Sequence, residues 1–159
     1  MVNFAEVIET IAKKLELSDE KAQEGADGYT VYTLVDSEGY VRYVGRTKDY
    51  GARMRAHRQA PNGKIYKYNL KEGYFYTGLT EAVARGYEQI LMVYCHTRNL
   101  SKDPNDSMVN FVNGVGPNNK KSEYYFNETK EFIQEYPTYF ENVLDNEMLN
   151  ILESKNNMW

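Results

Sequence analysis

The chain has 159 residues and a net charge of −4, which fits one domain with appendages and a core of ordinary size. Its single cysteine, Cys95, excludes an internal disulfide and any multi-cysteine zinc site, and only two histidines, His57 and His96, are present. No apolar run reaches transmembrane length and Met1 opens no signal-peptide pattern, so the sequence predicts a soluble protein without membrane insertion.

Residues 1–27 predict a helical N-terminal extension. Apolar side chains recur there at helical spacing: Phe4, Val7, Ile8, Ile11 and Leu15. Asn3 and Glu6 have the form of a capping box, and Ser18 can begin a second short helix that Gly25 ends. No chemistry is evident in this segment, and we expect it to pack on the domain.

A β-hairpin is expected next, from two segments rich in Val, Tyr and Thr. Tyr29–Val35 and residues 40–45 are separated by four turn-forming residues that end in Gly39. A turn across this break places Tyr32 directly opposite Tyr43, with Cβ atoms about 5 Å apart on one face. A register slip of one residue would move one ring to the other face.

A basic helix is expected after the hairpin, capped by Thr47 or Asp49 and running to about Arg58. Within it, Arg53 and His57 are spaced i, i+4 and therefore share a face. Two phenols, a guanidinium and an imidazole could then converge on one pocket.

The charge is unevenly distributed along the chain. Residues 40–71 carry nine basic side chains and one acidic side chain, a net +8, whereas residues 1–39 and 122–159 carry −6 each. A basic block between acidic flanks indicates a nucleic-acid-binding surface, and the alternative is a solvated helix face. The predicted phosphate contacts in this block are Arg46, Lys48, Arg55, Arg58 and Lys64.

Beyond the basic helix, residues 65–70 give no firm assignment, and residues 74–76 suit a short third strand bounded by glycines. Thr80 can cap a helix that reaches about Arg98. Glu88 lies at the edge of its apolar stripe, where a carboxylate is costly unless a metal ion or a cation satisfies it. The nearby carboxylate of Glu81 is explained as charge at the start of the helix.

The last part of the chain, residues 117–159, predicts a helical C-terminal extension packed on the domain. Residues 121–134 and 138–152 have helical periodicity, and Pro137 separates them. The buried side of the last helix is expected to consist of Phe140, Val143, Leu144, Met148, Ile151 and Leu152. Its exterior is acidic and does not suit phosphate.

The quoted motifs resemble those of the GIY-YIG nuclease family. The pair Val31-Tyr32 matches the first motif, although Val31-Tyr32-Thr33 stands in place of GIY, and Tyr43-Val44-Gly45 matches the second, with Asp49, Arg53 and His57 following at the family's spacings. The segment GLTEAVARGYEQILM resembles the family's helix that carries its metal-binding glutamate, which falls on Glu88. MVNFVNGVGP, with Asn110 and Asn113, resembles the closing segment of GIY-YIG domains in bacterial polymorphic toxins, and which asparagine matters stays open.

The resemblance covers residues 28–116 and implies an α+β fold, with a small, mainly antiparallel three-stranded sheet flanked by helices and extra helices at both ends. It implies a metal-dependent endonuclease that hydrolyses nucleic acid, with DNA favoured. The implied catalytic residues are Tyr32, Tyr43, Arg53, His57 and Glu88, with Glu88 holding Mg²⁺ or Mn²⁺. Which tyrosine deprotonates the water, and whether His57 relays the proton or orients a neighbour, stays open.

The toxin-like closing segment further implies the effector domain of a larger secreted protein, delivered into the cytoplasm of a target cell and bound by an immunity protein. Two alternatives remain. One is an RNA-cleaving enzyme of the same family, and the other is a catalytically silent module of the same fold that binds nucleic acid or protein.

Overall fold

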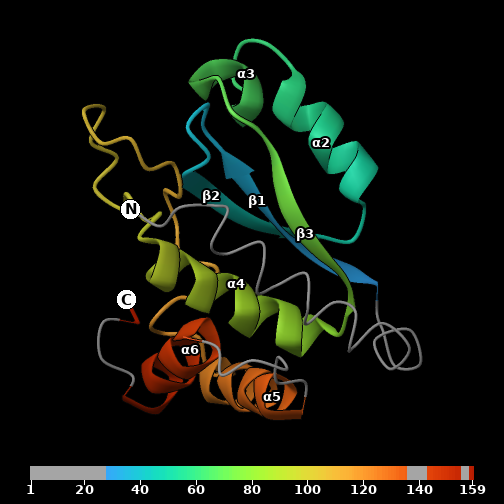
Figure 1. Ribbon diagram of the computed structural model, residues 1–159, viewed down its shortest axis with the longest axis vertical. Helices are drawn as coiled ribbons and strands as arrows, with labels where there is room; N and C mark the ends of the chain where they lie inside the picture. Colours follow the sequence, from blue (N-terminus) through green and yellow to red (C-terminus); the bar gives the residue numbers. More distant parts are fainter. Residues whose placement is uncertain (1–27, 136–142, 155–157) are drawn as a thin grey trace.

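The computed structural model describes residues 28–135, 143–154 and 158–159, which form an α+β fold (Figure 1). Three strands make one small antiparallel sheet in the order β2-β1-β3, which confirms the predicted class of fold. The elements are β1 (Tyr29–Val35), β2 (Val41–Thr47), α2 (Tyr50–Arg58), α3 (Lys64–Tyr68), β3 (Lys71–Leu79), α4 (Glu81–Cys95), α5 (Ser122–Glu135) and α6 (Val143–Ser154). The helices predicted within residues 1–27, and the region of Pro137 and Phe140, lie outside the described residues.

The predicted hairpin forms, but its register differs from the predicted one. Tyr32 pairs with Gly45, and Tyr43 pairs with Leu34, so the expectation that Tyr32 lies directly opposite Tyr43 is wrong. The strand pairing shifts register between Leu34 and Val35. The prediction counted residues outward from the turn and assumed a regular pairing without this shift. Because the difference amounts to two residues, one full period of side-chain alternation, both rings still lie on one face, with centroids 6.0 Å apart.

The two faces of the sheet are covered by different helices (Figure 1). Alternate residues of β1 divide between two cores: Val31 and Val35 pack with α4, whereas Tyr32 and Leu34 pack with α2 and α3. Helices α5 and α6 lie on the outer side of α4, and their buried side chains belong to the α4 core: Phe126, Ile133, Met148 and Leu152. The described parts of α5 and α6 therefore share one core with α4.

Capping side chains set the helix boundaries. Asp49 accepts a main-chain N–H from the first turn of α2 at 2.9 Å, and Thr80 does the same for α4 at 3.3 Å, so both predicted caps are confirmed. Helix α4 ends at Cys95, three residues before the predicted Arg98, because His96 adopts a left-handed φ of 55°.

Two elements between α2 and α4 are more extensive than predicted. Strand β3 runs beyond the predicted residues 74–76 because it pairs with β1 from Tyr29 to Val35. The unassigned segment before it forms the short helix α3, which ends where Asn69 adopts a left-handed φ of 55°. Helix α3 places the ammonium of Lys64 over the ring of Tyr43.

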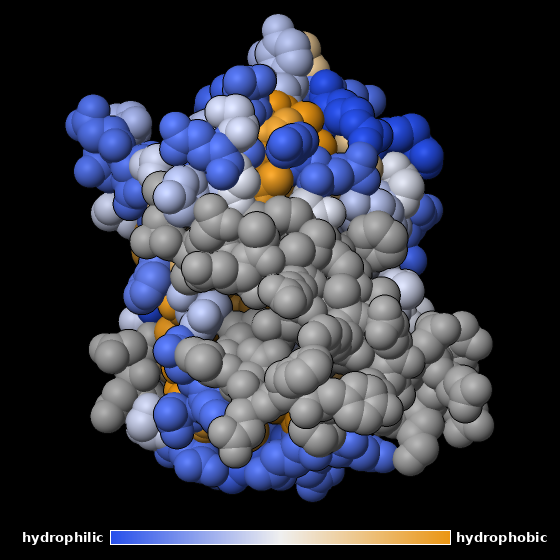
Figure 2. Space-filling model, viewed as in Figure 1, coloured by the Kyte–Doolittle hydropathy of each residue, from blue (hydrophilic) through white to orange (hydrophobic). Residues whose placement is uncertain are grey.

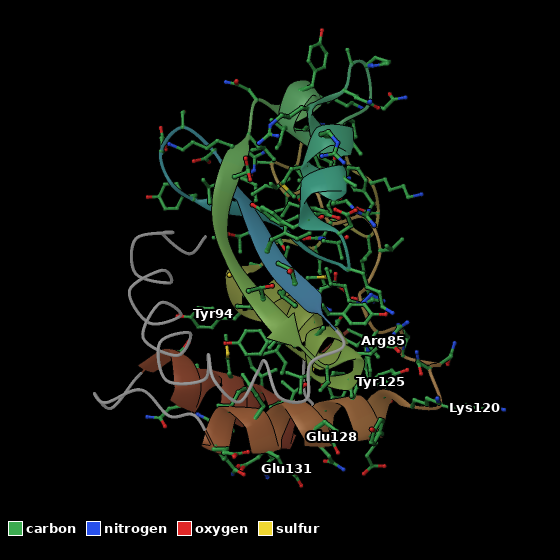
Figure 3. All side chains as sticks on the ribbon, turned by 90° about the vertical axis from the view of Figure 1, so that its right-hand side faces the viewer. Arg85, Tyr94, Lys120, Tyr125, Glu128 and Glu131 are labelled. Atoms are coloured by element: carbon green, nitrogen blue, oxygen red, sulfur yellow. The ribbon has the colours of Figure 1, made fainter. Side chains whose placement is uncertain are left out.

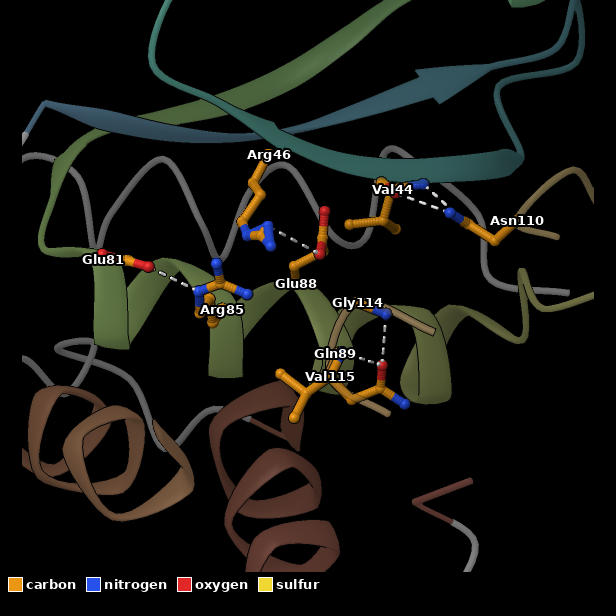
Figure 4. Close-up of polar contacts among 9 residues, drawn as sticks. All are labelled: Val44, Arg46, Glu81, Arg85, Glu88, Gln89, Asn110, Gly114 and Val115. Atoms are coloured by element: carbon orange, nitrogen blue, oxygen red, sulfur yellow. Dashed lines mark hydrogen bonds and ion pairs between the residues drawn. The ribbon is translucent and has the colours of Figure 1, made fainter. Parts of the chain in front are cut away.

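The outer edge of β2 is closed by the segment around Asn110. The Val44 N–H donates to Asn110 Oδ1 at 2.9 Å, and Asn110 Nδ2 donates to the Val44 carbonyl at 2.8 Å (Figure 4). Thr97 donates its hydroxyl to the same Oδ1 at 2.7 Å, and the Val109 N–H donates to the Arg42 carbonyl at 3.1 Å. These contacts satisfy an edge that would otherwise be open to pairing with another strand.

The last helix, α6, carries the exposed acidic residues Glu147 and Glu153, as predicted, and α5 carries exposed acidic residues as well. Figure 3 shows Glu131 on the side of α5 that faces away from the sheet, while Arg85 of α4 lies beside the ring of Tyr125, 5.4 Å from its centroid.

No helix among residues 28–135 and 143–154 is both long enough and apolar enough to cross a membrane.

Close packing of α4 on α5 generates the first prediction. A Cβ added at Gly86 would overlap the Thr129 hydroxyl and the Tyr125 carbonyl. We therefore expect Gly86→Ala to lower the free energy of unfolding by about 1–3 kcal/mol, although alanine is the better helix former. Gly51→Ala in α2 is the matched control, because a Cβ there meets only ordinary contacts, and it should raise stability by about 0.5–1 kcal/mol. Urea unfolding of both variants checks the pair, and two changes of the same sign would contradict the packing argument.

Candidate active site

An aromatic cluster occupies the α2 side of the hairpin. The hydroxyl of Tyr32, a residue only 1% exposed, lies 2.7 Å from His57 Nε2. The His57 ring centroid is 5.7 Å from that of Tyr32 and 5.5 Å from that of Tyr43. Gly45, opposite Tyr32, leaves the space that the hydroxyl occupies, since an added Cβ would overlap it. The strand register and the i, i+4 face of α2 thus bring together the residues of both sequence motifs.

Burial determines the protonation states in this cluster. It lowers the pKa of His57 to about 4, assisted by the charges of Arg53 and Lys64, so the imidazole is neutral at physiological pH. Burial also raises the pKa of Tyr32 and of Tyr43. For Tyr43, the Glu88 charge adds to this increase, whereas the hydrogen bond with Tyr32 and the charge of Arg53 oppose it. Each phenol therefore affects the pKa of the other.

Glu88 projects from α4 toward the outer edge of β2 (Figure 4). It is 6% exposed, and burial raises the pKa of its carboxyl to about 7, an effect that Arg46 and Arg85 partly offset. The Arg46 guanidinium lies 3.9 Å from the carboxylate. On the other side the main chain of Gly114 approaches so closely that an added Cβ would overlap the carboxylate. Glu81, the competing carboxylate, instead pairs with Arg85 at 2.9 Å.

The loop beside Glu88 is held by Gln89, a completely buried residue that sequence reasoning missed. Its Oε1 accepts the N–H groups of Gly114 at 2.9 Å and Val115 at 3.2 Å (Figure 4). Its Nε2 donates to Asn113 Oδ1 at 3.0 Å and to the Met158 carbonyl at 2.7 Å. The signal that could have found it is an amide between apolar neighbours on a fully buried stretch of α4, where it needs partners.

The chain end reinforces the same loop. Trp159 donates its indole N–H to the Val115 carbonyl at 2.6 Å, and Arg98 donates to the Met158 carbonyl at 2.8 Å. Residues 158–159 therefore contact both the loop and the helix that carry the site.

Two neighbouring cavities share part of their walls. The smaller, of about 310 Å³, is lined by Glu88 together with Tyr43, Arg46, Arg53, Lys64 and Asn113, among others. The larger, of about 440 Å³, is lined by His57, Asn62 and Gly63 together with the shared residues Tyr43, Arg53 and Lys64. Tyr32 lines neither cavity, so Tyr43 is the member of the phenol pair on the cavity walls. A third cavity of about 800 Å³, between α4 and α6, has none of the predicted site residues on its wall.

Three of the predicted phosphate contacts lie away from these cavities. The ammonium of Lys48 sits 5.0 Å from the ring centroid of Tyr29, and Arg58 pairs with Glu72. Arg55 lies on the exposed face of α2 and lines neither cavity. These three side chains could contact only the parts of a nucleic acid that lie outside the cavities, and such contacts remain predictions.

The donor set of the smaller cavity fits a weakly held divalent ion. Within the described residues, no three or more His, Cys, Asp or Glu side chains gather into a group that could hold a metal. Glu88 alone supplies a buried carboxylate to this cavity. Mg²⁺ commonly binds through one or two carboxylates, with waters and substrate phosphates completing its coordination. Glu88 therefore fits an ion, Mg²⁺ or Mn²⁺, that binds together with a phosphate.

The chain was compared with protein-family models, with curated proteins and with solved structures. None matches. The resemblance to the GIY-YIG family therefore rests on the motif residues of this chain, and membership remains a proposal.

The two candidate asparagines have different surroundings, which generates a stability prediction. Asn110, 3% exposed, satisfies both main-chain groups of Val44 and the hydroxyl of Thr97, so Asn110→Ala should cost about 2–4 kcal/mol of unfolding free energy. The side chain of Asn113 accepts one hydrogen bond, from Gln89, so Asn113→Ala should cost about 1 kcal/mol or less. Urea unfolding measures both, and equal losses would contradict the assignment of Asn110 to the β2 edge.

The raised pKa of Glu88 predicts a pH-dependent effect of Glu88→Gln. The folded state binds the Glu88 proton more tightly than the unfolded state, so ionisation of this carboxyl costs stability as pH rises from about 4.5 to about 7. The variant should match the parent at pH 4 and exceed it at pH 8 by up to about 3 kcal/mol. Glu81→Gln is the control on the same helix. Arg85 lowers the Glu81 pKa, so that variant should lose a little stability at pH 8. Chemical unfolding at both pH values tests the signs, and a Glu88→Gln protein destabilised at pH 8 would make Glu88 a net stabilising ion-pair partner.

Proposed function

We propose that this protein is a metal-dependent endonuclease of the GIY-YIG type that hydrolyses phosphodiester bonds, with DNA the favoured substrate. The observation that carries the proposal is the smaller cavity. A buried carboxylate, two guanidiniums, an ammonium and a phenol lie on the wall of one space of about 310 Å³. Hydrolysis of a phosphodiester requires these same groups, because an anion must be bound, charge neutralised and a water deprotonated.

The cations of the smaller cavity suit a phosphate. Arg46 and Arg53 present planar forks that match phosphate oxygens, and Lys64 adds a compact charge. The Nε of Arg46 is a buried donor without a hydrogen-bond partner in the described part of the chain. A phosphate oxygen would supply the acceptor that this donor lacks.

The distribution of charge over the surface supports an approach of nucleic acid from the α2 side. In Figure 2 strongly hydrophilic residues lie over α2, at the upper right of the view, where Arg53, Arg55 and Arg58 are exposed. The acidic residues of α5 lie at the opposite end of the molecule (Figures 1 and 3). A polyanion would therefore be attracted to one end and repelled from the other, which the net charge of −4 conceals.

Glu88 would hold the divalent ion, which supplies charge neutralisation and lowers the pKa of a water when bound. The phenol pair would take the proton of the attacking water. Tyr43 is the member that reaches the cavity, and the buried Tyr32 can share its proton with it. The neutral imidazole of His57 fixes the Tyr32 hydroxyl at 2.7 Å. Burial raises the pKa of Tyr43, and the charges of Arg53 and Arg46 oppose this increase and so favour the ionised form of the pair.

The test is incubation of the purified protein with supercoiled plasmid and, separately, with total RNA, each with Mg²⁺ and with EDTA. We expect nicking of plasmid that depends on Mg²⁺, and a loss of about 10²-fold or more in Glu88→Gln, because one electrostatic stabiliser of the reaction is removed. Glu81→Gln, on the same helix outside the cavity, should cleave at the parental rate.

Each other outcome has a definite meaning. Cleavage of RNA alone would identify the RNA-cleaving alternative. Binding of nucleic acid without cleavage of either substrate would identify the silent module. A Glu88→Gln protein that cleaves at the parental rate would exclude Glu88 from the site. We also propose an effector role, with delivery into another cell and an immunity protein that covers the basic end. The cleavage test does not address this role.

A further inference from the structure

Lys64 occupies a position that binding of phosphate alone does not explain. Its ammonium lies 5.0 Å from the ring centroid of Tyr43 and 4.8 Å from that of Phe111. Cation–π contacts with two rings therefore restrain the ammonium. Lys64 is half-buried at the start of α3 and lines both cavities. The two ring contacts restrain the ammonium at the wall that the two cavities share.

The shared wall is where the sugar oxygens of the cleaved linkage would lie. A phosphate bound beside Glu88 in the smaller cavity connects to the next nucleotide, for which the neighbouring cavity of about 440 Å³ provides room. A strand that passes between the two cavities must cross the wall formed by Tyr43, Arg53 and Lys64. On this path one bridging oxygen of the phosphate would pass beside the Lys64 ammonium.

We propose that Lys64 is the general acid that protonates the leaving sugar oxygen, an inference that rests on the proposed nuclease function. The oxygen of the attacking water forms a bond to phosphorus, and the water proton goes to the ionised phenol pair. The bond between phosphorus and the sugar oxygen breaks, and that oxygen takes a proton from Lys64 Nζ. The neutral amine of Lys64 and the protonated phenol pair then exchange protons with solvent, so every proton is accounted for.

The other cations of the site cannot take this role. Arg46 and Arg53 are guanidiniums, which do not release protons at neutral pH. Lys64 can, and burial followed by the charge of Lys67 lowers the pKa of its ammonium, which makes it a better proton donor. The charged and titratable groups around it come from each packed element: Tyr43 and Arg46 of β2, Arg53 and His57 of α2, Lys67 of α3 and Glu88 of α4.

The geometry also separates the acid from the base. Lys64 Nζ lies over the face of the Tyr43 ring, whereas the phenol oxygen lies at its edge. The two groups could therefore contact different oxygens of one phosphate. Displacement at phosphorus further requires that these oxygens lie on opposite sides of the phosphorus.

The test compares Lys64→Gln and Lys64→Arg on oligonucleotides with an ordinary linkage and with one sulfur in place of the 3′ or the 5′ bridging oxygen. A thiolate leaves without protonation, so loss of a general acid affects only the oxygen linkage. We expect both variants to cleave the oxygen linkage about 10²–10⁴-fold more slowly than the parent. Their rate on the sulfur linkage that the parent cleaves should change little. Lys71→Gln, at the start of β3 with an exposed side chain that lines neither cavity, is the matched control and should cleave both as the parent does.

The outcomes distinguish this inference from the nuclease proposal beneath it. If the parent cleaves neither substrate, the proposed function fails. If the parent cleaves both and the Lys64 variants lose both equally, or if Lys64→Arg keeps full activity on the oxygen linkage, Lys64 is a phosphate contact and the inference is overturned. Cleavage of the sulfur linkage shows in the same experiment that a variant is folded. A ¹⁵N NMR titration of Nζ in the free protein adds a reading without substrate, and a Lys64 pKa at or above the ordinary lysine value would also count against the role.

Discussion

A carboxylate buried between a helix and the edge of a sheet imposes the main constraint on this structure. Only 6% of Glu88 is exposed, so water solvates its carboxylate poorly and nearby charges of the protein must compensate. Arg46 does so twice, because its guanidinium lies 3.9 Å away and its main-chain N–H also favours the ionised carboxyl. Gln89, the residue after Glu88, accepts a hydrogen bond from Gly114, and this glycine leaves room for the Glu88 carboxylate. Helix α4, the β2 edge and this loop are thus positioned around one negative charge.

Local patterns in the sequence were sufficient to predict the strands and helices that carry the motifs. The strands of the hairpin, the Asp49 and Thr80 caps and the shared face of Arg53 and His57 all depend on neighbours within a few residues. The strand register was not predictable in this way, since the shift between Leu34 and Val35 depends on pairing with both β2 and β3. The same reason explains the missed Gln89 network, which joins three segments far apart in the chain.

The two cores divide the site between them. The phenol pair and His57 lie over the core that α2 and α3 cover, whereas Glu88 comes from the helix that packs on the opposite face. The groups meet because β2 is the edge strand, so α4 can present a side chain past it. A central strand in this position would have separated them. Edge strands usually need protection from pairing, and here the protecting contacts also line the smaller cavity.

The contacts of residues 158–159 link the site to the order in which the chain is made. In the loop at residues 113–115 the Gly114 N–H donates to Gln89 and the Val115 carbonyl accepts from Trp159, and the Met158 carbonyl accepts from both Gln89 and Arg98. On the ribosome, every other described element is synthesised before these two residues appear. The loop beside Glu88 therefore gains its hydrogen bond from Trp159 only when this residue has emerged, long after Arg46, Arg53 and Lys64 of the smaller cavity have been made.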